Sequence, residues 1–294
     1  MRAFFRQYGF AYGLLAPAFL TILVVALYPS GRTLWVSLHK VSMILPGFAF
    51  VGLRNYERLA HDDRFWNAWT NTAYFTGATV AGETLLGLGM ALVLAQDFRG
   101  RGLVRAAVLV PWAIPTVVSS RLWGLIFSTD SGIANYLLRS GHVIGSYVNW
   151  LGDTRWAMNV AVLVDVWKTT PFMALLLLAG LSTISGDLYE AAKVDGATQI
   201  QRFTQITVPL LLPVMLVAVM LRALDAFRVF DIIYVLTGGG PADSTEVMST
   251  LTYKILFSAT QFGYGSAIAS SMFVTLLAVS LVFLVFLRQR LEVE

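Results

Sequence analysis

The stretch LYEAAKVDGATQIQRFTQITVPLLLP, residues 188–213, is polar and charged, although it lies between two long apolar segments. Its first half predicts a short helix that Asp187 caps, with Glu190 three residues later in a variant of the capping box. Gly196 is able to take the positive φ that ends such a helix. A second short helix is expected over residues 198–206. The stretch therefore predicts a helix–turn–helix connector between two apolar helices.

The composition of the chain is that of a membrane protein. Of its 294 residues, 57% are hydrophobic and 13% are charged, and the mean hydropathy is +0.69. A soluble domain carries roughly 25% charged residues. The absence of cysteine excludes a disulfide framework, a thiolate zinc site and a thiol nucleophile. The net charge of +4 comes without a basic stripe of interleaved aromatics, which argues against a nucleic-acid surface.

Six apolar runs are long enough for helical membrane spans, which need about 20 residues each. They cover roughly residues 9–30, 69–95, 103–127, 157–181, 208–235 and 264–287. Pro209 suits the first turn of the fifth span, where its missing N–H costs nothing. The first run is longer than the apolar core of a cleavable signal, so we expect it to be retained. Because the runs are continuous and do not alternate with period two, the pattern argues against a β-barrel. The sequence predicts an all-α, polytopic membrane helix bundle of about six transmembrane helices.

Basic residues indicate the orientation of this bundle. Arg99, Arg101 and Arg105 lie in one short connection, and two further arginines lie near the C-terminus. Both groups favour the cytoplasm, although segment 32–66 on the opposite side also carries basic residues. We therefore expect both termini to be cytoplasmic. We also expect one membrane domain, 1–294, with a cytoplasmic loop at about 183–207.

Eight charged residues fall inside the predicted spans, four acids and four bases. They are Glu83, Arg121, Asp165, Lys168, Arg222, Asp225, Arg228 and Asp231. A charge near the bilayer centre costs at least ~2.5–3.5 kcal/mol, so such groups usually pair with one another or line a wet cavity. Three i,i+3 spacings put possible partners on one helix face. These are Asp165 with Lys168, Arg222 with Asp225, and Arg228 with Asp231.

Two interpretations of these charges remain open. They are either ion pairs that hold the spans together or the lining of a polar path for a sugar, whose hydroxyls bind carboxylates and guanidinium groups. Transporter sites favour the membrane midplane, which favours the second interpretation for Arg222 and Asp225. Glu83 and Arg121 are interpreted as structural. The candidate path residues are Asp165, Lys168, Arg222, Asp225, Arg228 and Asp231.

The sequence predicts no catalytic residues, no metal site and no cofactor bound by this chain. His39, His61 and His142 are scattered over predicted outer loops. No run matches the G-x-x-x-x-G-K-[ST] pattern of a nucleotide-binding loop. LTGGGPADS, residues 236–244, is glycine-rich but is read as a turn.

The segment EAAKVDGATQIQRFTQITVPLLLP resembles the EAA loop of binding-protein-dependent ABC importer permeases. The matching ATPase-coupling positions are Glu190, Ala191, Ala192, Asp195, Gly196 and Ala197. FVGLRNYERL, GRGLVRAAVLVPWAIPTVVSSRLWGLIF, VWKTTPFMALLLLAGL and RALDAFRVFDIIYVLTGGGP resemble other parts of sugar-importer permeases, most closely those of trehalose- and maltose-type systems. The resemblance covers nearly the whole chain.

This resemblance implies the type I ABC importer fold and a place in a prokaryotic inner (plasma) membrane. It also implies four kinds of partner: a second homologous permease, two ATPase subunits that bind ATP and Mg, an extracytoplasmic sugar-binding protein, and a sugar substrate. In this family the EAA helix docks on an ATPase subunit. We expect the binding protein to meet two outer segments, represented by Asn55, Tyr56, Gly238, Gly239 and Gly240.

The predicted cargo is a neutral disaccharide or oligosaccharide of trehalose or maltose type. A glycerol-phosphate or polyol importer permease is the nearest alternative, although an anionic cargo would need a more positive cavity. A secondary transporter that uses Asp165 or Asp225 as a cation site is a second alternative, but it would leave the EAA pattern unexplained. An integral-membrane enzyme would require a catalytic cluster at one depth, which the scattered histidines do not provide.

Overall fold

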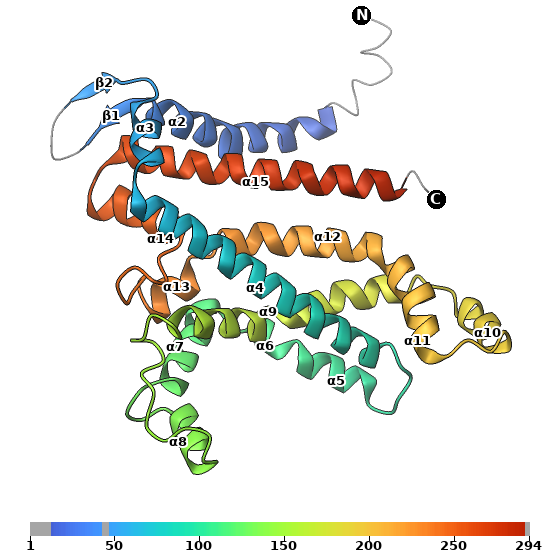
Figure 1. The fold of residues 1–294 in the computed structure, drawn as a ribbon. Coiled ribbons are helices and arrows are strands. Elements are labelled where there is room, and N and C mark those ends of the chain that lie inside the picture. Colours follow the sequence, from blue (N-terminus) through green and yellow to red (C-terminus); the bar gives the residue numbers. More distant parts are fainter. Residues whose placement is uncertain (1–12, 43–46, 292–294) are drawn as a thin grey trace, which may run out of the picture. The chain divides into compact units, whose positions relative to one another are not determined.

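The computed structural model describes residues 13–42 and 47–291, which are mostly helical (Figure 1). Five helices in the described residues are long and apolar enough to cross a membrane, and a bent helix pair adds a possible sixth span. The prediction of about six spans in an all-α bundle is therefore confirmed. The spans lie at Gly13–Ser37, Asp63–Leu94, Arg101–Ala113 with Thr116–Ile126, Ala157–Leu181, Gln199–Phe227 and Phe262–Phe286.

The predicted third span, 103–127, is not a continuous helix. Helices α5 (Arg101–Val108) and α6 (Val110–Ala113) precede a break, and α7 (Thr116–Ile126) follows it at a bend of 88°. Pro115 causes the break because its ring disfavours helical geometry at the preceding residue. Ile114 accordingly has an extended ψ of 133°.

The predicted fifth span, 208–235, is also shorter than expected. Helix α12 (Val208–Phe227) ends eight residues early, and a separate helix α13 (Asp231–Leu236) follows. The Ser249 hydroxyl donates a hydrogen bond to the backbone carbonyl of Val229 in the break. A side chain from elsewhere in the chain therefore takes up a carbonyl that a continuous helix would bond internally.

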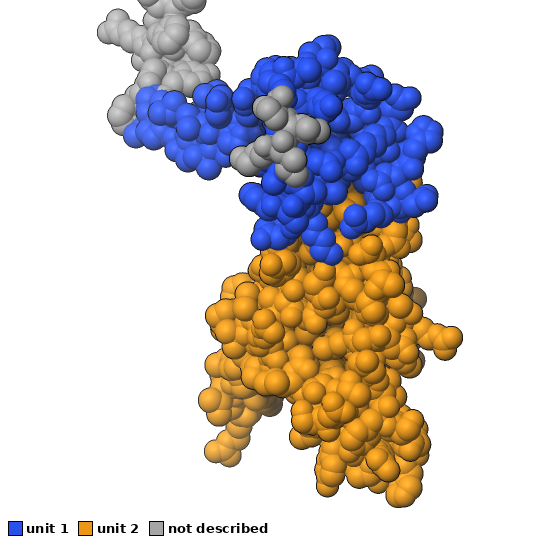
Figure 2. Space-filling model, turned by 90° about the vertical axis from the view of Figure 1, so that its left-hand side faces the viewer, with its two compact units in different colours: residues 1–65, 252–274 blue, residues 66–251, 275–294 orange. Residues whose placement is uncertain are grey.

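The described chain divides into two compact units (Figure 2). Of the described residues, unit 1 contains 13–42, 47–65 and 252–274. Its regular elements are η1 (Ile22–Leu27), α2 (Tyr28–Ser37), β1 (His39–Val41), β2 (Phe48–Phe50), α3 (Arg54–Ala60), η3 (Lys254–Ser258) and the first part of α15 (Phe262–Leu291). The two strands pair antiparallel, with His39 opposite Phe50.

Of the described residues, unit 2 contains 66–251 and 275–291. It includes α5, α6, α7, α12 and α13, which are described above. Its other elements are most of α4 (Asp63–Leu94), α8 (Ile133–Ser140), α9 (Ala157–Leu181), α10 (Gly186–Val194), α11 (Gln199–Arg202), η2 (Phe203–Thr207) and the start of α14 (Met248–Tyr253). Helix α9 packs against α12, α6 and α13. It is the most buried of the candidate spans, which makes it the central helix of unit 2.

Close packing fixes α9 against α12. A Cβ atom on Gly180 of α9 would lie 2.7 Å from Leu211 Cδ1 and 2.9 Å from Val214 Cγ1 on α12. Met173, Leu177 and Leu211 belong to one apolar cluster at this contact. Because small residues allow helices to approach closely in membranes, Gly180 sets the distance between the two helices that carry most of the candidate path residues.

Candidate functional site

All six candidate path residues line a single cavity in unit 2. Its volume is about 380 Å³, and its lining consists of Thr116, Asp165, Lys168, Thr169, Arg222, Asp225, Ala226, Arg228, Val229, Phe230, Asp231 and Ile232. Helices α9 and α12 supply half of these residues, and most of the others come from the break between α12 and α13 and from the start of α13. The helix break that sequence reasoning missed is therefore part of the cavity wall.

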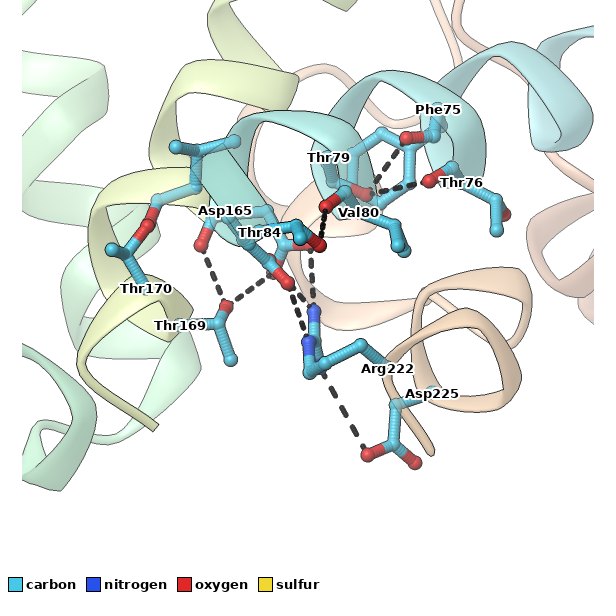
Figure 3. A network of polar contacts seen from close by, with 12 residues as sticks. Phe75, Thr76, Thr79, Val80, Thr84, Asp165, Thr169, Thr170, Arg222 and Asp225 are labelled. Atoms are coloured by element: carbon cyan, nitrogen blue, oxygen red, sulfur yellow. Dashed lines mark hydrogen bonds and ion pairs between the residues drawn. The ribbon is translucent and has the colours of Figure 1, made fainter. Parts of the chain in front are cut away.

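Arg222 is the centre of the charged network at this cavity (Figure 3). Its Nε donates to Glu83 Oε2 at 2.6 Å, and its Nη2 donates to Glu83 Oε1 at 2.9 Å. Nη2 also donates to Asp165 Oδ2 at 3.3 Å. All three residues are buried. One guanidinium group thus connects α4, α9 and α12 through a two-pronged contact with one carboxylate, which is the strong geometry for this pair.

The pairing expected from i,i+3 spacing is wrong in two of three cases and secondary in the third. Arg222 Nη1 lies 3.9 Å from Asp225 Oδ2, farther than its contacts with Glu83. Arg228 pairs with Asp225 at 2.7 Å in place of Asp231. Because α12 ends at Phe227, helical spacing no longer applies between Arg228 and Asp231.

Asp165 and Lys168 also differ from the expected pair. Asp165 forms its ion pair with Arg222 and accepts a hydrogen bond from Thr169 Oγ1 at 3.1 Å. Lys168 Nζ donates to the backbone carbonyl of Trp112 at 3.4 Å. The side chain of Lys168 therefore binds the end of α6, and the i,i+3 rule failed here because a partner from another helix was closer.

The charged side chains divide into a buried set and an accessible set. The side chains of Glu83 and Arg222 are 0% and 6% exposed, whereas those of Asp225 and Arg228 are 53% and 60% exposed. Glu83 does not line the cavity, yet it is the principal partner of Arg222. Its interpretation as structural fits this position behind the cavity wall.

Phe230 is a cavity residue that sequence reasoning did not single out. It lines the cavity, and its ring stacks on that of Tyr234 with the centroids 5.1 Å apart. An aromatic face beside carboxylate and guanidinium groups is suited to a ligand with one apolar face and many hydroxyls. The only signal in the sequence was its position between Arg228 and Asp231.

Residues 188–213, which the EAA resemblance predicts to be the coupling stretch, have the predicted helix–turn–helix form with one different cap. Ser185, and not Asp187, caps α10, because its side chain accepts a hydrogen bond from the Asp187 backbone N–H. Gly196 has the expected positive φ, at 78°. Thr198 and Gln201 form a capping box at the start of α11. The second helix does not stop near residue 206 but continues through η2 into α12.

The coupling residues predicted by the EAA pattern lie on an accessible part of the fold. Glu190, Ala191, Asp195 and Gly196 are exposed, while Ala192 and Ala197 are half-buried. Apolar side chains are also exposed along this polar stretch, namely those of Leu188, Val194 and Ile200, with Val194 at 88%. Tyr189 is turned the other way, and its hydroxyl lies 3.0 Å from Thr207 Oγ1 in η2.

The predicted glycine turn is confirmed by positive φ angles at Gly238 and Gly239. Gly238 is exposed, Gly239 is buried and Gly240 is half-buried. The Thr245 backbone N–H donates to the Gly239 carbonyl at 3.2 Å, so the turn is stabilised by its own backbone.

In the residues that the structure describes, no group of three His, Cys, Asp or Glu side chains is close enough together to hold a metal ion.

The other predicted outer contact is the segment around Asn55 and Tyr56 in unit 1, and both side chains form hydrogen bonds within that unit. Asn55 Nδ2 donates to the Ser37 carbonyl at 2.7 Å and to the His39 carbonyl at 3.1 Å. The Tyr56 hydroxyl lies 2.7 Å from Ser37 Oγ. Both side chains fasten α3 to the end of α2, and the surface beside them is formed by exposed residues such as Leu53.

Comparisons with known proteins cover nearly the whole chain. Residues 83–293 match the family described as binding-protein-dependent transport system inner membrane component. The chain is 46% identical over 281 residues to the trehalose/maltose transport system permease protein MalF of Thermococcus litoralis, covering 95% of this chain and 94% of that protein. It is 41% identical to the trehalose transport system permease protein SugA of Mycobacterium tuberculosis, covering 93% and 87% of the two chains.

The fold also matches a solved structure. A chain of a bacterial ABC transporter involved in the import of the acidic polysaccharide alginate aligns with a TM-score of 0.83 and 23% identity, covering 98% of this chain and 99% of that one. At this identity the likeness concerns the fold alone. The sequence relatives and the family match carry the assignment: the chain belongs to the binding-protein-dependent transport system inner membrane components, which are multi-pass membrane parts of ABC transporters and not enzymes.

Proposed function

We propose that this chain is the permease subunit of an ABC importer for a neutral disaccharide or oligosaccharide of trehalose or maltose type. The relatives named for trehalose and maltose transport support the sugar class. The cavity supports the neutral charge, because its lining carries three acids and three bases. These are Asp165, Asp225 and Asp231, and Lys168, Arg222 and Arg228.

The cavity at the α12–α13 break is the observation that carries this proposal. Arg228 and Asp225 present half-exposed charged groups, which form strong hydrogen bonds with sugar hydroxyls. Phe230 supplies an aromatic face in the same cavity. Buried Arg222 is held by Glu83 and is therefore pre-organised for any hydrogen bond that it makes to cargo. A phosphate-bearing polyol would find no net positive charge there.

Coupling to ATP hydrolysis is assigned to the exposed stretch around α10. Leu188 and Val194 are exposed apolar side chains within it, and they are available to pack against a partner that docks there. One of the two ATPase subunits, which bind ATP and Mg, would engage this stretch and, through Tyr189 and η2, act on α12. We propose that a second permease completes the path and that the EAA side and both termini are cytoplasmic.

The outer turn is assigned to the extracytoplasmic binding protein. Gly238 is exposed with a positive φ, and a glycine turn lets a partner approach the backbone closely. The segment around Asn55 and Tyr56 is the second contact proposed. In the proposed cycle, a loaded binding protein and closure of the ATPase pair turn the cavity outward, and ATP hydrolysis returns it inward.

Uptake by the reconstituted complex tests the proposal. The permease pair, the ATPase subunits and the binding protein are placed in proteoliposomes and supplied with labelled trehalose, maltose or glycerol 3-phosphate. ATP-dependent uptake of one of the two disaccharides is the expected result. Uptake of glycerol 3-phosphate alone would establish the polyol-phosphate alternative. Uptake driven by a proton or sodium gradient without ATP would establish a secondary transporter.

Two variants connect that uptake to the cavity. Arg228→Gln and Phe230→Leu are each expected to raise the half-saturating sugar concentration several-fold while basal ATP hydrolysis stays unchanged. Arg101→Gln is the matched control, because Arg101 forms an exposed ion pair with Asp97 and does not line this cavity. Equal uptake kinetics in all three variants would place the sugar elsewhere.

A further inference from the structure

Asp225 lies between two guanidinium groups at the cavity. Its Oδ1 is 2.7 Å from Arg228 Nη2, and its Oδ2 is 3.9 Å from Arg222 Nη1. All three residues line the cavity, and the Asp225 side chain is half-exposed. One carboxylate therefore faces both arginines from the side that is open to a ligand.

The two arginines differ in how far they depend on Asp225. Arg222 has Glu83 and Asp165 as additional acidic partners. The other hydrogen bond that the structure gives the Arg228 guanidinium runs from Nε to the Leu224 carbonyl at 3.1 Å. Within the described part of the chain, Asp225 is the carboxylate that neutralises Arg228. Without it, a planar fork of N–H donors would face the cavity, and this fork matches carboxylate, sulfonate and phosphate groups.

We propose that Asp225 excludes anionic saccharides from the cavity. Its carboxylate occupies the guanidinium groups that an acidic sugar would bind, and it also repels the negative charge of that sugar. A site gains specificity in this way when an unfavourable contact is built in against the wrong ligand. Neutral sugars lack the charge and keep their hydrogen bonds to the lining. This inference rests on the proposed function, because it assumes that sugar enters this cavity.

The position of Asp225 distinguishes this role from a simple effect of net charge. Asp231 is an exposed acid on α13 that lines the same cavity. In the described residues it makes no ion pair with Arg222 or Arg228. Asp225→Asn and Asp231→Asn therefore change the cavity charge equally, but only the first change frees a guanidinium group.

Equilibrium binding with a matched pair of sugars tests the proposal. The complete permease and ATPase complex is held in lipid nanodiscs without the binding protein, so that the binding protein does not select the sugar. The probes are radiolabelled maltose and the same disaccharide with one hydroxymethyl group oxidised to a carboxylate. The measured quantity is the ratio of their affinities in wild type, Asp225→Asn, Asp225→Ser, Asp231→Asn and Asp97→Asn. Asp97 provides a remote control because it pairs with Arg101 on the surface.

We expect the wild-type complex to prefer maltose by at least tenfold. Asp225→Asn and Asp225→Ser should each shift the ratio toward the acidic sugar by at least tenfold, and 0.5 M salt should reduce that shift because it screens exposed charges. Asp231→Asn should shift the ratio less, and Asp97→Asn should leave it unchanged.

Two outcomes overturn the inference and leave the proposed function standing. The first is an unchanged ratio in both Asp225 variants while maltose still binds, and the second is an equal shift in Asp231→Asn and Asp225→Asn. If wild type binds neither sugar and the uptake assay also fails, the proposed function is wrong and the inference falls with it.

Discussion

Arg222 shows how much of the cavity depends on one side chain. Its guanidinium group is buried and holds carboxylates from two other helices, Glu83 on α4 and Asp165 on α9. Loss of one partner from a buried ion pair costs about 3–5 kcal/mol because the remaining charge is uncompensated, whereas replacing both partners is often neutral. The stability of this region is therefore expected to depend on matched charges more than on any single residue.

Substitution of Arg222 by methionine is expected to destabilise the assembled complex by about 3–5 kcal/mol, because Glu83 and Asp165 lose their shared cation. The double variant Arg222→Met with Glu83→Met should recover part of the loss, because Asp165 stays buried without its cation. Arg228→Met should cost about 0.2–1 kcal/mol, since its ion pair with Asp225 is exposed. Size-exclusion chromatography after graded heating measures all three, and a wild-type midpoint for Arg222→Met would contradict the expectation.

At the residue scale, the sequence singled out charged positions inside apolar runs but did not show which of them pair. Charged residues inside apolar runs are conspicuous, and all six candidates do line one cavity. The principal partner of Arg222 is Glu83, 139 residues away in the chain. Local helical spacing contains no information about such a contact. Phe230 escaped notice because an aromatic residue in an apolar run is ordinary.

At the element scale, the turn between α10 and α11 is where the coupling stretch is most sensitive to backbone conformation. Gly196 has a φ of 78°, and a Cβ atom there would meet nothing within 4 Å. Gly186, at the start of α10, also has open space but no positive φ. Comparing the same substitution at the two glycines therefore separates the effect of backbone conformation from the effect of an added side chain.

Gly196→Ala is expected to strain this turn by about 1–2 kcal/mol, because left-handed backbone is unfavourable for residues with a Cβ. The complex should still assemble, while ATP hydrolysis stimulated by the loaded binding protein falls. Gly186→Ala should leave both properties unchanged. The ratio of stimulated to basal ATP hydrolysis is the measurement, and equal ratios in the two variants would show that the turn geometry does not affect coupling.

A hydrogen bond connects α10 to η2, the segment that continues into α12 at the cavity. The Tyr189 hydroxyl on α10 is hydrogen-bonded to Thr207 in η2, which runs directly into α12. Tyr189→Phe removes this bond and is expected to cost about 0.5–1.5 kcal/mol and to lower sugar-stimulated ATP hydrolysis. Tyr136→Phe, at an exposed position on α8, is the control. Unchanged stimulation of ATP hydrolysis in Tyr189→Phe would show that other contacts couple α10 to α12.

The elements were predictable where hydropathy alone decides them and less so where backbone constraints intervene. Long apolar runs located the spans, and Gly196 and the glycine turn were recognised from residues that favour positive φ. The break at Pro115 was missed because a proline within an apolar run is also compatible with a kinked helix. The early end of α12 was missed because apolar residues continue through the break.

At the scale of the whole molecule, the absence of cysteine makes the predicted docking of the binding protein accessible to labelling. In a complex whose other chains also lack cysteine, Gly238→Cys carries a single reactive thiol at an exposed turn. A bulky maleimide there is expected to slow sugar uptake severalfold without changing basal ATP hydrolysis. The same label at Gly145→Cys, in another exposed loop, should have little effect. Normal uptake with the Gly238 label would move the docking site elsewhere.

The three-helix contact of Arg222 also has a consequence for how the protein is made. Ribosomes deliver α4 to the membrane first, so Glu83 arrives before its partner, which follows 139 residues later. An unpaired carboxylate in hydrocarbon is costly. The Glu83 side chain on the nascent α4 is therefore expected to stay in contact with water or with polar groups of another protein until α12 is synthesised. Closure of this contact therefore shows that synthesis has passed α12. A polypeptide that stops short of Arg222 would leave Glu83 and Asp165 without their shared cation.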